Sequence, residues 1–313
     1  MKQGEKNMKV GYAVLYTDGT LVISKNSTLS NKNITKDYGE FEDINVPWKD
    51  ESLKIKKIQI LDPVKSNCMK VWFENCIYLT TLINFKDLDT SNCTDFSKIF
   101  YNCQSLKNLN GLQNWDVSNG TNFNSMFAYC LSLQALNELK NWNVSKGTDF
   151  SYMFCNCGSL KNLNELKNWN VFTGTNFSNM FTFCGSLQDL NGLENWNVYN
   201  GIYFSKMFSY CVSLQNINGL ENWNVENGMD FSFMFAHCKS LQDISVLQNW
   251  NVSKGEYFKS MFYNCKSLQD ISVSNTLTIL TKKMFYNCNP NLKIHWKKHT
   301  YTYADLLEYE EIC

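Results

Sequence analysis

Residues 126–152, MFAYCLSLQALNELKNWNVSKGTDFSY, form one full unit of the repeat that organises this chain. The cysteine of this unit recurs every 27 residues, in a column made of Cys76, Cys103, Cys130, Cys157, Cys184, Cys211, Cys238 and Cys265. A fixed period of this size is the signature of a solenoid, in which each repeat is one coil packed on its neighbours. We therefore expect the 313 residues to form one elongated array, in place of two average globular domains.

Most of the other repeated positions are apolar. In the unit quoted above they are Leu133, Leu136, Leu139, Trp142, Val144, Phe150 and the Met126-Phe127 pair. A large apolar side chain contributes about 1.5–3 kcal/mol when it is buried. A single coil has no interior of its own, so this gain comes from stacking the coils.

Each coil is expected to combine two short elements, which defines an α/β repeat solenoid. The L-x-x-L-x-x-L spacing after each cysteine favours a short strand. The FSYMF segment, residues 150–154, favours a short helical turn. A glycine column follows the tryptophans and is expected to form a corner with positive φ; its members are Gly120, Gly147, Gly174, Gly201, Gly228 and Gly255.

The ends of the chain depart from the repeat. Residues 1–62 are predicted to form a β-rich cap or accessory domain, with a hairpin over 9–25 that turns at Asp18-Gly19, a polar loop over 25–36 and a strand within 53–62. The solenoid is assigned to 63–290, with about eight to nine coils. Residues 291–313 are predicted to form a cap, with a strand over 292–296 and a short helix over 300–311.

Composition limits the partners. Lys plus Arg and Asp plus Glu both number 29, so charge gives no reason to expect nucleic acid or an anionic membrane as a partner. The sequence has no apolar run long enough for a transmembrane helix and no secretory signal at its N-terminus. It also lacks a phosphate-binding glycine loop and a nucleophile elbow. We therefore expect no enzyme, cofactor or metal; an enzyme site within residues 1–62 is a remote alternative.

Two conspicuous columns have alternative interpretations. The cysteines could form disulfides or bind metal, but a column with one cysteine per coil favours buried free thiols. Zinc at Cys155 and Cys157 is likewise not expected. The tryptophans could stack on carbohydrate, but their periodic position favours a core role. The asparagines beside them are expected to satisfy backbone groups at the bends, and His237 is expected to be a surface variant.

The repeat MF-x-x-C-x-S-L-x-x-L, followed by N-W-N-V-S-x-G-T-x-F-S-x-M-F, resembles the BspA-like leucine-rich repeats. It is more closely similar to a bacterial surface-protein repeat of about 26 residues, common in low-GC bacteria, mycoplasmas and their phages. The resemblance covers residues 69–290, with one extra residue per coil and Gly-Thr where the family often has Val-Thr. It implies a leucine-rich-repeat-like solenoid and non-enzymatic adhesion or ligand binding at a cell surface or on a virion. Without a secretion signal, a cytoplasmic location stays open.

A solenoid binds through the positions that its core does not fix. Aromatic or apolar residues stand at several such positions where other coils carry small polar or charged ones; the candidate ligand-binding surface comprises Phe172, Tyr199, Tyr203, Phe233 and Tyr257, with Ile202 and Met229 nearby. Polar residues after the cysteines, such as Gln134 and Gln188, form a second candidate face. The leading hypothesis is an adhesin for a protein or glycan; the alternative is an intracellular scaffold. Ligand identity and oligomeric state stay open.

Overall fold

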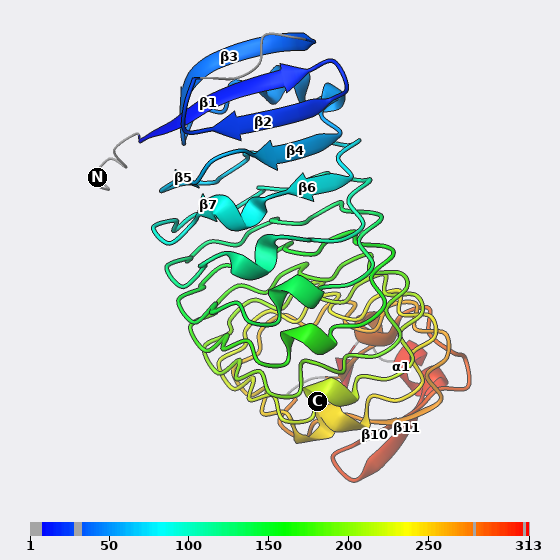
Figure 1. Cartoon of the computed structure of the whole chain (residues 1–313). Helices are drawn as coiled ribbons and strands as arrows, with labels where there is room; N and C mark the ends of the chain where they lie inside the picture. The colour runs from blue at the N-terminus through cyan, green and yellow to red at the C-terminus, as the bar shows by residue number, and fades with distance from the viewer. Residues whose placement is uncertain (1–7, 28–32, 278–279, 309–310, 313) are drawn as a thin grey trace.

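The computed structural model describes residues 8–27, 33–277, 280–308 and 311–312. A sheet at the N-terminal end leads into a stack of coils that follow one another in chain order toward the C-terminus (Figure 1). Consecutive coils are joined by isolated parallel β-bridges whose partners are 27 positions apart, from Asp95 and Asn122 to Asp230 and Tyr257. The architecture is a repeat solenoid, as the period predicts.

The predicted N-terminal hairpin is confirmed: β1 (Lys9–Tyr16) and β2 (Thr20–Ser24) pair antiparallel. At the turn, Asp18 accepts hydrogen bonds from the N–H and the hydroxyl of Thr20, both at 2.9 Å. Gly19 has φ of +84°, a left-handed conformation that glycine adopts without steric cost. Strand β3 (Ile34–Glu42) pairs antiparallel with the other edge of β1. Residues 28–32 of the expected polar loop lie outside the described residues.

The sheet continues into the first coils. Strand β4 (Lys57–Ile60) is parallel to β2, and β6 (Thr81–Ile83) is parallel to β4, which gives the order β3-β1-β2-β4-β6. The strand expected within 53–62 is therefore present, preceded by the 3₁₀ helix η1 (Lys49–Lys54). Beside this sheet, β5 (Val64–Lys65) pairs in parallel with β7 (Leu88–Asp89). The division of the chain at residues 62 and 290 stays a prediction.

Two buried tryptophans fix this sheet to the solenoid. The Nε1–H of Trp48 donates to the carbonyl of Trp72 at 2.6 Å, and the Nε1–H of Trp72 donates to the carbonyl of Asp43 at 2.8 Å. Phe41 packs edge-on against both rings. Indole groups satisfied in this way can fill the end of the core without leaving a buried polar atom unpaired.

The strand expected after each cysteine is wrong for the central coils. Strands occur at this position in the first and last coils, as β6 and β8 (Asp270–Ser272), whereas the segment is irregular between them. Its leucines are three residues apart, and an extended strand would alternate them between two faces. Three-residue turns keep them on one face instead: the N–H of Leu133 donates to Cys130 O, and that of Leu139 to Leu136 O.

Short 3₁₀ helices follow at the third leucine of the motif or its equivalent in several coils. They are η2 (Phe85–Asp87), η3 (Leu112–Asn114), η4 (Asn137–Leu139), η5 (Asn164–Leu166), η6 (Asn218–Leu220) and η7 (Ser245–Asn249).

The helical turn expected over residues 150–154 is also wrong. In the equivalent segment one coil earlier, Phe123, Ser125, Phe127 and Tyr129 donate their N–H groups to carbonyls of the next coil, at 2.7–2.9 Å. Ser125 and Tyr129 have φ of 56° and 63°, which is left-handed. An α-helix would direct these N–H groups back along the chain. Here alternate residues bond to the neighbouring coil, so the segment is a ladder between coils.

The C-terminal end is a small mixed cap. Strand β10 (Lys293–Trp296) pairs in parallel with β8 and antiparallel with β11 (His299–Thr302), which confirms the strand expected over 292–296. Helix α1 (Tyr303–Glu308) covers part of the range 300–311, and residues 309–310 lie outside the described residues. The remaining elements are β9 (Leu280–Thr281), η8 (Lys282–Phe285) and β12 (Glu311–Ile312), with β9 and β12 paired antiparallel. Within the described ranges, no helix is sufficiently long and apolar to cross a membrane.

Candidate functional site

The cysteine column is structural. The cysteines of the column, from Cys76 to Cys265, are free thiols and are buried. The Sγ of Cys130 donates to the carbonyl of Phe100 in the preceding coil at 3.3 Å, and Cys184 does the same to Phe154. Burial raises the pKa of Cys130 to about 12. Because the thiolate is the reactive form, these thiols act as small core residues, and the preference for free thiols is confirmed.

The tryptophan column is also part of the core. Its rings are 1–4% exposed and stack with their neighbours at centroid distances of 6.2–6.4 Å. The Nε1–H of Trp142 donates to the carbonyl of Leu112 in the preceding coil at 2.9 Å. The Oδ1 of Asn143 accepts the N–H of Ser145 and closes a turn within its own coil. The core role expected from the period is confirmed, since rings at this depth present no face to a sugar.

The corner glycines were expected to have positive φ, and this is wrong: positive φ among described glycines occurs at Gly19, Gly39, Gly111 and Gly192. The corner column needs glycine for space. A Cβ at Gly201 would lie 2.3 Å from Cζ of Phe204, and one at Gly228 would lie 2.4 Å from Cζ of Phe231.

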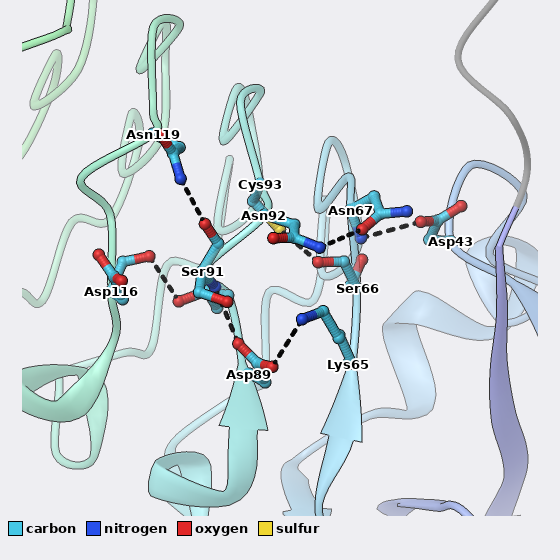
Figure 2. A network of polar contacts seen from close by, with 11 residues as sticks. Asp43, Lys65, Ser66, Asn67, Asp89, Ser91, Asn92, Cys93, Asp116 and Asn119 are labelled. Atoms are coloured by element: carbon cyan, nitrogen blue, oxygen red, sulfur yellow. Dashed lines mark hydrogen bonds and ion pairs between the residues drawn. The ribbon is translucent and has the colours of Figure 1, made fainter.

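One buried polar network lies where the N-terminal sheet meets the first coils (Figure 2). Asp43 is 1% exposed and accepts N–H groups from Met8 and Asn67 at 3.1 and 3.0 Å. Cys93, which stands where later coils have the corner glycine, donates to the carbonyl of Ser66 at 3.0 Å. The polar groups of this network hold backbone segments together, so we assign it a structural role.

A carboxylate at the edge of this network is also fixed by its neighbours. Hydrogen bonds from Ser91 lower the pKa of the Asp89 carboxyl, and Lys65 forms an ion pair with it at 3.2 Å (Figure 2). Across the described ranges, no group of three or more His, Cys, Asp and Glu residues could hold a metal ion.

Four of the five predicted surface residues lie next in sequence to residues that line one groove, although none of the four is part of the lining itself. The corner groove, about 880 Å³ in volume, crosses four successive coils. Phe172 and Tyr199 directly precede groove residues in the sequence, while Tyr203 directly follows one and Tyr257 another. All four are exposed, at 43%, 38%, 48% and 57% respectively. The groove is lined by Thr173, Thr175, Asn200, Ile202, Asn227, Met229 and residues 253–256.

Phe233 lies elsewhere. It is half-buried and left-handed, with φ of 58°, on the segment that forms the ladder between coils. The ammonium of Lys206 lies 5.7 Å from its ring centroid, and, unlike the other four, Phe233 has no sequence neighbour in the groove lining. The five residues therefore mark two separate surfaces, and their role in binding stays a prediction.

A second row of aromatic rings was missed. The residue immediately before the column cysteine is left-handed and points outward; Phe183, Tyr210 and His237 stack there at centroid distances of 4.3 and 4.0 Å. His237 is thus half-buried in a stack, and this burial together with Lys239 lowers its pKa. The signal was available, because this position changes between Asn and aromatic residues from coil to coil. We call these three residues the aromatic column.

The fold and its surface define a non-globular, leucine-rich-repeat-type solenoid protein. A sequence profile described as "Mycoplasma protein of unknown function, DUF285" matches residues 67–191 and 175–296. The chain belongs to this family, which confirms the resemblance to a repeat found in mycoplasmas. No curated protein matches the chain.

Three solved bacterial structures are similar over 95% of the chain. They are a leucine-rich cell surface protein of Faecalibacterium prausnitzii (13% identity, 96% of its chain, TM-score 0.35) and leucine-rich repeat proteins of Eubacterium ventriosum (13%, 100%, 0.33) and Bacteroides ovatus (15%, 100%, 0.29). TM-scores of this size describe a distant likeness, so the assignment of the fold rests on the chain's own coils and ladder.

Proposed function

We propose that this protein is a non-enzymatic binding protein that presents its repeat surface to a protein or glycan ligand. The observation that carries the proposal is the corner groove, because it crosses the coils in which exposed aromatic rings replace small polar or charged residues. Grouped exposed aromatic side chains are typical of interaction surfaces. If this corner were only exposed to solvent, we would expect these positions to carry Ser, Asn and Asp, as the equivalent positions of other coils do.

The chemistry of the groove supports binding without catalysis. Its ionisable side chains are those of Lys254 and Glu256, and among the described residues neither is hydrogen-bonded to a hydroxyl group of the lining, as activation of a nucleophile would require. The cysteines of the column cannot serve as nucleophiles, because burial raises the pKa of thiols such as Cys184 well above 9.0.

The location of the protein is part of the same proposal. We propose a cell surface or virion location, which the resemblance of its repeat to bacterial surface-protein repeats supports. The alternative, an intracellular scaffold, places the same binding surface in the cytoplasm. Fractionation of the native host, followed by detection of the protein in surface or soluble fractions, decides between them.

Binding is tested with substitutions that copy residues from other coils and so leave the fold intact. The groove variant Tyr199→Ser with Tyr203→Asn takes its residues from Ser145 and Asn176. The ladder variant Phe233→Ser copies Ser260, and the control Tyr152→Ser copies Ser125 at an exposed position in a coil outside the groove lining. Binding to host cells and to a panel of purified surface proteins and glycans is then measured.

The proposal predicts that the groove variant loses binding and the control retains it. Loss in the ladder variant would move the site to the other surface. Equal binding by all variants and the unaltered chain would show that neither aromatic surface is the binding site, and no binding to any ligand would refute the proposal.

A further inference from the structure

We infer that the corner groove binds a linear, uncharged oligosaccharide that lies along the solenoid axis. This inference rests on the proposed binding function and specifies its ligand class. It follows from three features of the groove: its charge, the state of its backbone hydrogen bonds and its spacing.

The first feature is charge. The groove pairs one cation, Lys254, with one anion, Glu256, on a chain in which positive and negative residues balance. A phosphate, nucleic acid or strongly acidic peptide would require clustered Lys or Arg residues. The remaining polar lining consists of amides and hydroxyls, which both donate and accept hydrogen bonds as sugar hydroxyls do.

The second feature is the backbone at the groove. The carbonyl of Thr175 already accepts two N–H groups, from Ile202 and Tyr203, at 2.9 and 3.1 Å. The carbonyls of Ile202 and Met229 each accept two N–H groups from the next coil in the same way. An extended peptide that adds to an edge needs free backbone partners, and these main-chain groups are already used between coils. A ligand recognised by side chains is therefore favoured over a peptide strand.

The side chains that remain suit a sugar. The Nδ2 of Asn200 donates to the carbonyl of Phe172 at 2.8 Å, which fixes the amide. Its Oδ1 accepts no hydrogen bond from the described residues, so it is available to a ligand hydroxyl. Half-buried Ile202 and Met229 provide apolar surface where earlier coils have Thr. This apolar surface can pack on the C–H groups of a pyranose, whereas the exposed ring of Tyr203, which follows Ile202 in the chain, lies outside the groove lining.

The third feature is spacing. The buried rings of Phe177, Phe204 and Phe231 stack from coil to coil at 5.6 and 5.5 Å, and those of Trp196 and Trp223 stack at 6.2 Å, so one coil advances by a distance in this range. This advance is close to the length of one pyranose unit in an extended chain. Four coils line the groove, so equivalent side chains can meet four successive sugar units.

The test uses the full chain and four uncharged probes: cellotetraose, tetra-N-acetylchitotetraose, and the disaccharides cellobiose and di-N-acetylchitobiose. Isothermal titration calorimetry should show tighter binding of at least one tetrasaccharide than of its disaccharide. The variant Tyr203→Asn with Ile202→Thr, which restores residues found at Asn176 and Thr175, should weaken binding about tenfold, or about 1.4 kcal/mol. The control Tyr152→Ser should bind as the unaltered chain does, and circular dichroism should confirm that all variants fold.

Each of the other outcomes contradicts one part of the inference. If tetrasaccharide and disaccharide bind equally, the ligand does not follow the coils. If the groove variant binds normally, the sugar site is elsewhere. If none of the four sugar probes binds, while a purified protein ligand binds to the unaltered chain and not to the groove variant, the sugar inference fails and the proposed binding function stands. If no ligand of any class binds, both fail.

Discussion

A methyl group added at the corner glycine Gly201 should destabilise the solenoid, chiefly through its contact with the ring of Phe204. In Gly201→Ala, the new Cβ would lie 2.3 Å from Cζ of Phe204 and 2.9 Å from the carbonyl oxygen of Val198. The ring of Phe204 cannot shift along the solenoid axis, because Phe177 and Phe231 stack on its two faces at 5.6 and 5.5 Å. Overpacking of this kind costs about 1–3 kcal/mol, and we expect a value near the upper end.

The measurement is the free energy of unfolding from urea titration followed by circular dichroism. Gly185→Ala is the matched control, since its Cβ would meet nothing nearer than Cγ2 of Val212 at 3.8 Å. The backbone at Gly185 is not in the left-handed region, so alanine can adopt its conformation. The substitution is expected to be neutral, or to stabilise the protein by about 0.4–1 kcal/mol because it lowers the conformational entropy of the unfolded chain. Comparable losses in both variants would show that the contact with Phe204 is not the cause.

A double-mutant cycle then separates the contact from backbone strain. Phe204→Leu removes the far end of the ring and leaves a cavity, so it destabilises the protein by itself. Adding Gly201→Ala to this variant should cost less than adding it to the native sequence, with a coupling energy of about 1–3 kcal/mol. Strictly additive costs would refute the assignment and would return the glycine requirement to backbone conformation.

The cysteine and tryptophan columns lead to further predictions. Native protein at neutral pH should expose at most one of its thirteen thiols to Ellman's reagent, because the twelve that the structure describes are buried; reaction of several would contradict the column. Burial raises the pKa of Cys130 from 9.0 to about 12, so the stability that the neutral thiol contributes is fully present below pH 9.0 and is lost as the pH rises toward 12. The decline in Tm over that range should be smaller in Cys130→Ala, and identical declines would argue against the shift. Trp169→Phe should cost about 0.5–1.5 kcal/mol in urea unfolding through the lost hydrogen bond, because the carbonyl of Leu139 loses the indole N–H that it accepts at 2.9 Å and keeps the N–H of Trp142 at 3.0 Å; an unchanged midpoint would show that this hydrogen bond does not contribute.

The candidate site was only partly predictable. Tyr199 and Tyr203 break the repeat at positions that the core does not use, and the structure shows that they are exposed and adjacent in sequence to groove residues, while their role in binding stays a prediction. Phe233 was identified by the same reasoning, yet it lies on another surface, because position along a coil does not by itself say which outward direction a left-handed residue takes. The aromatic column was missed, although Phe183, Tyr210 and His237 occupy one repeated position, because stacking between coils depends on ring orientation.

The sequence by itself determined that the chain forms a solenoid, that its coils stack in chain order, and which repeated residues form its core. A column such as Cys130 or Trp142 that recurs on a fixed period can be buried only if equivalent residues of successive coils lie one above another, so burial followed from the period. Tertiary structure decided the backbone. Residues such as Ser125 find their hydrogen-bond partners in the next coil, and this ladder contains left-handed residues four positions apart, such as Ser125 and Tyr129, where local spacing indicated a helix. Tertiary structure also decided the reason for glycine at Gly201 and the position of the corner groove, because both depend on contacts that exist only when coils are stacked.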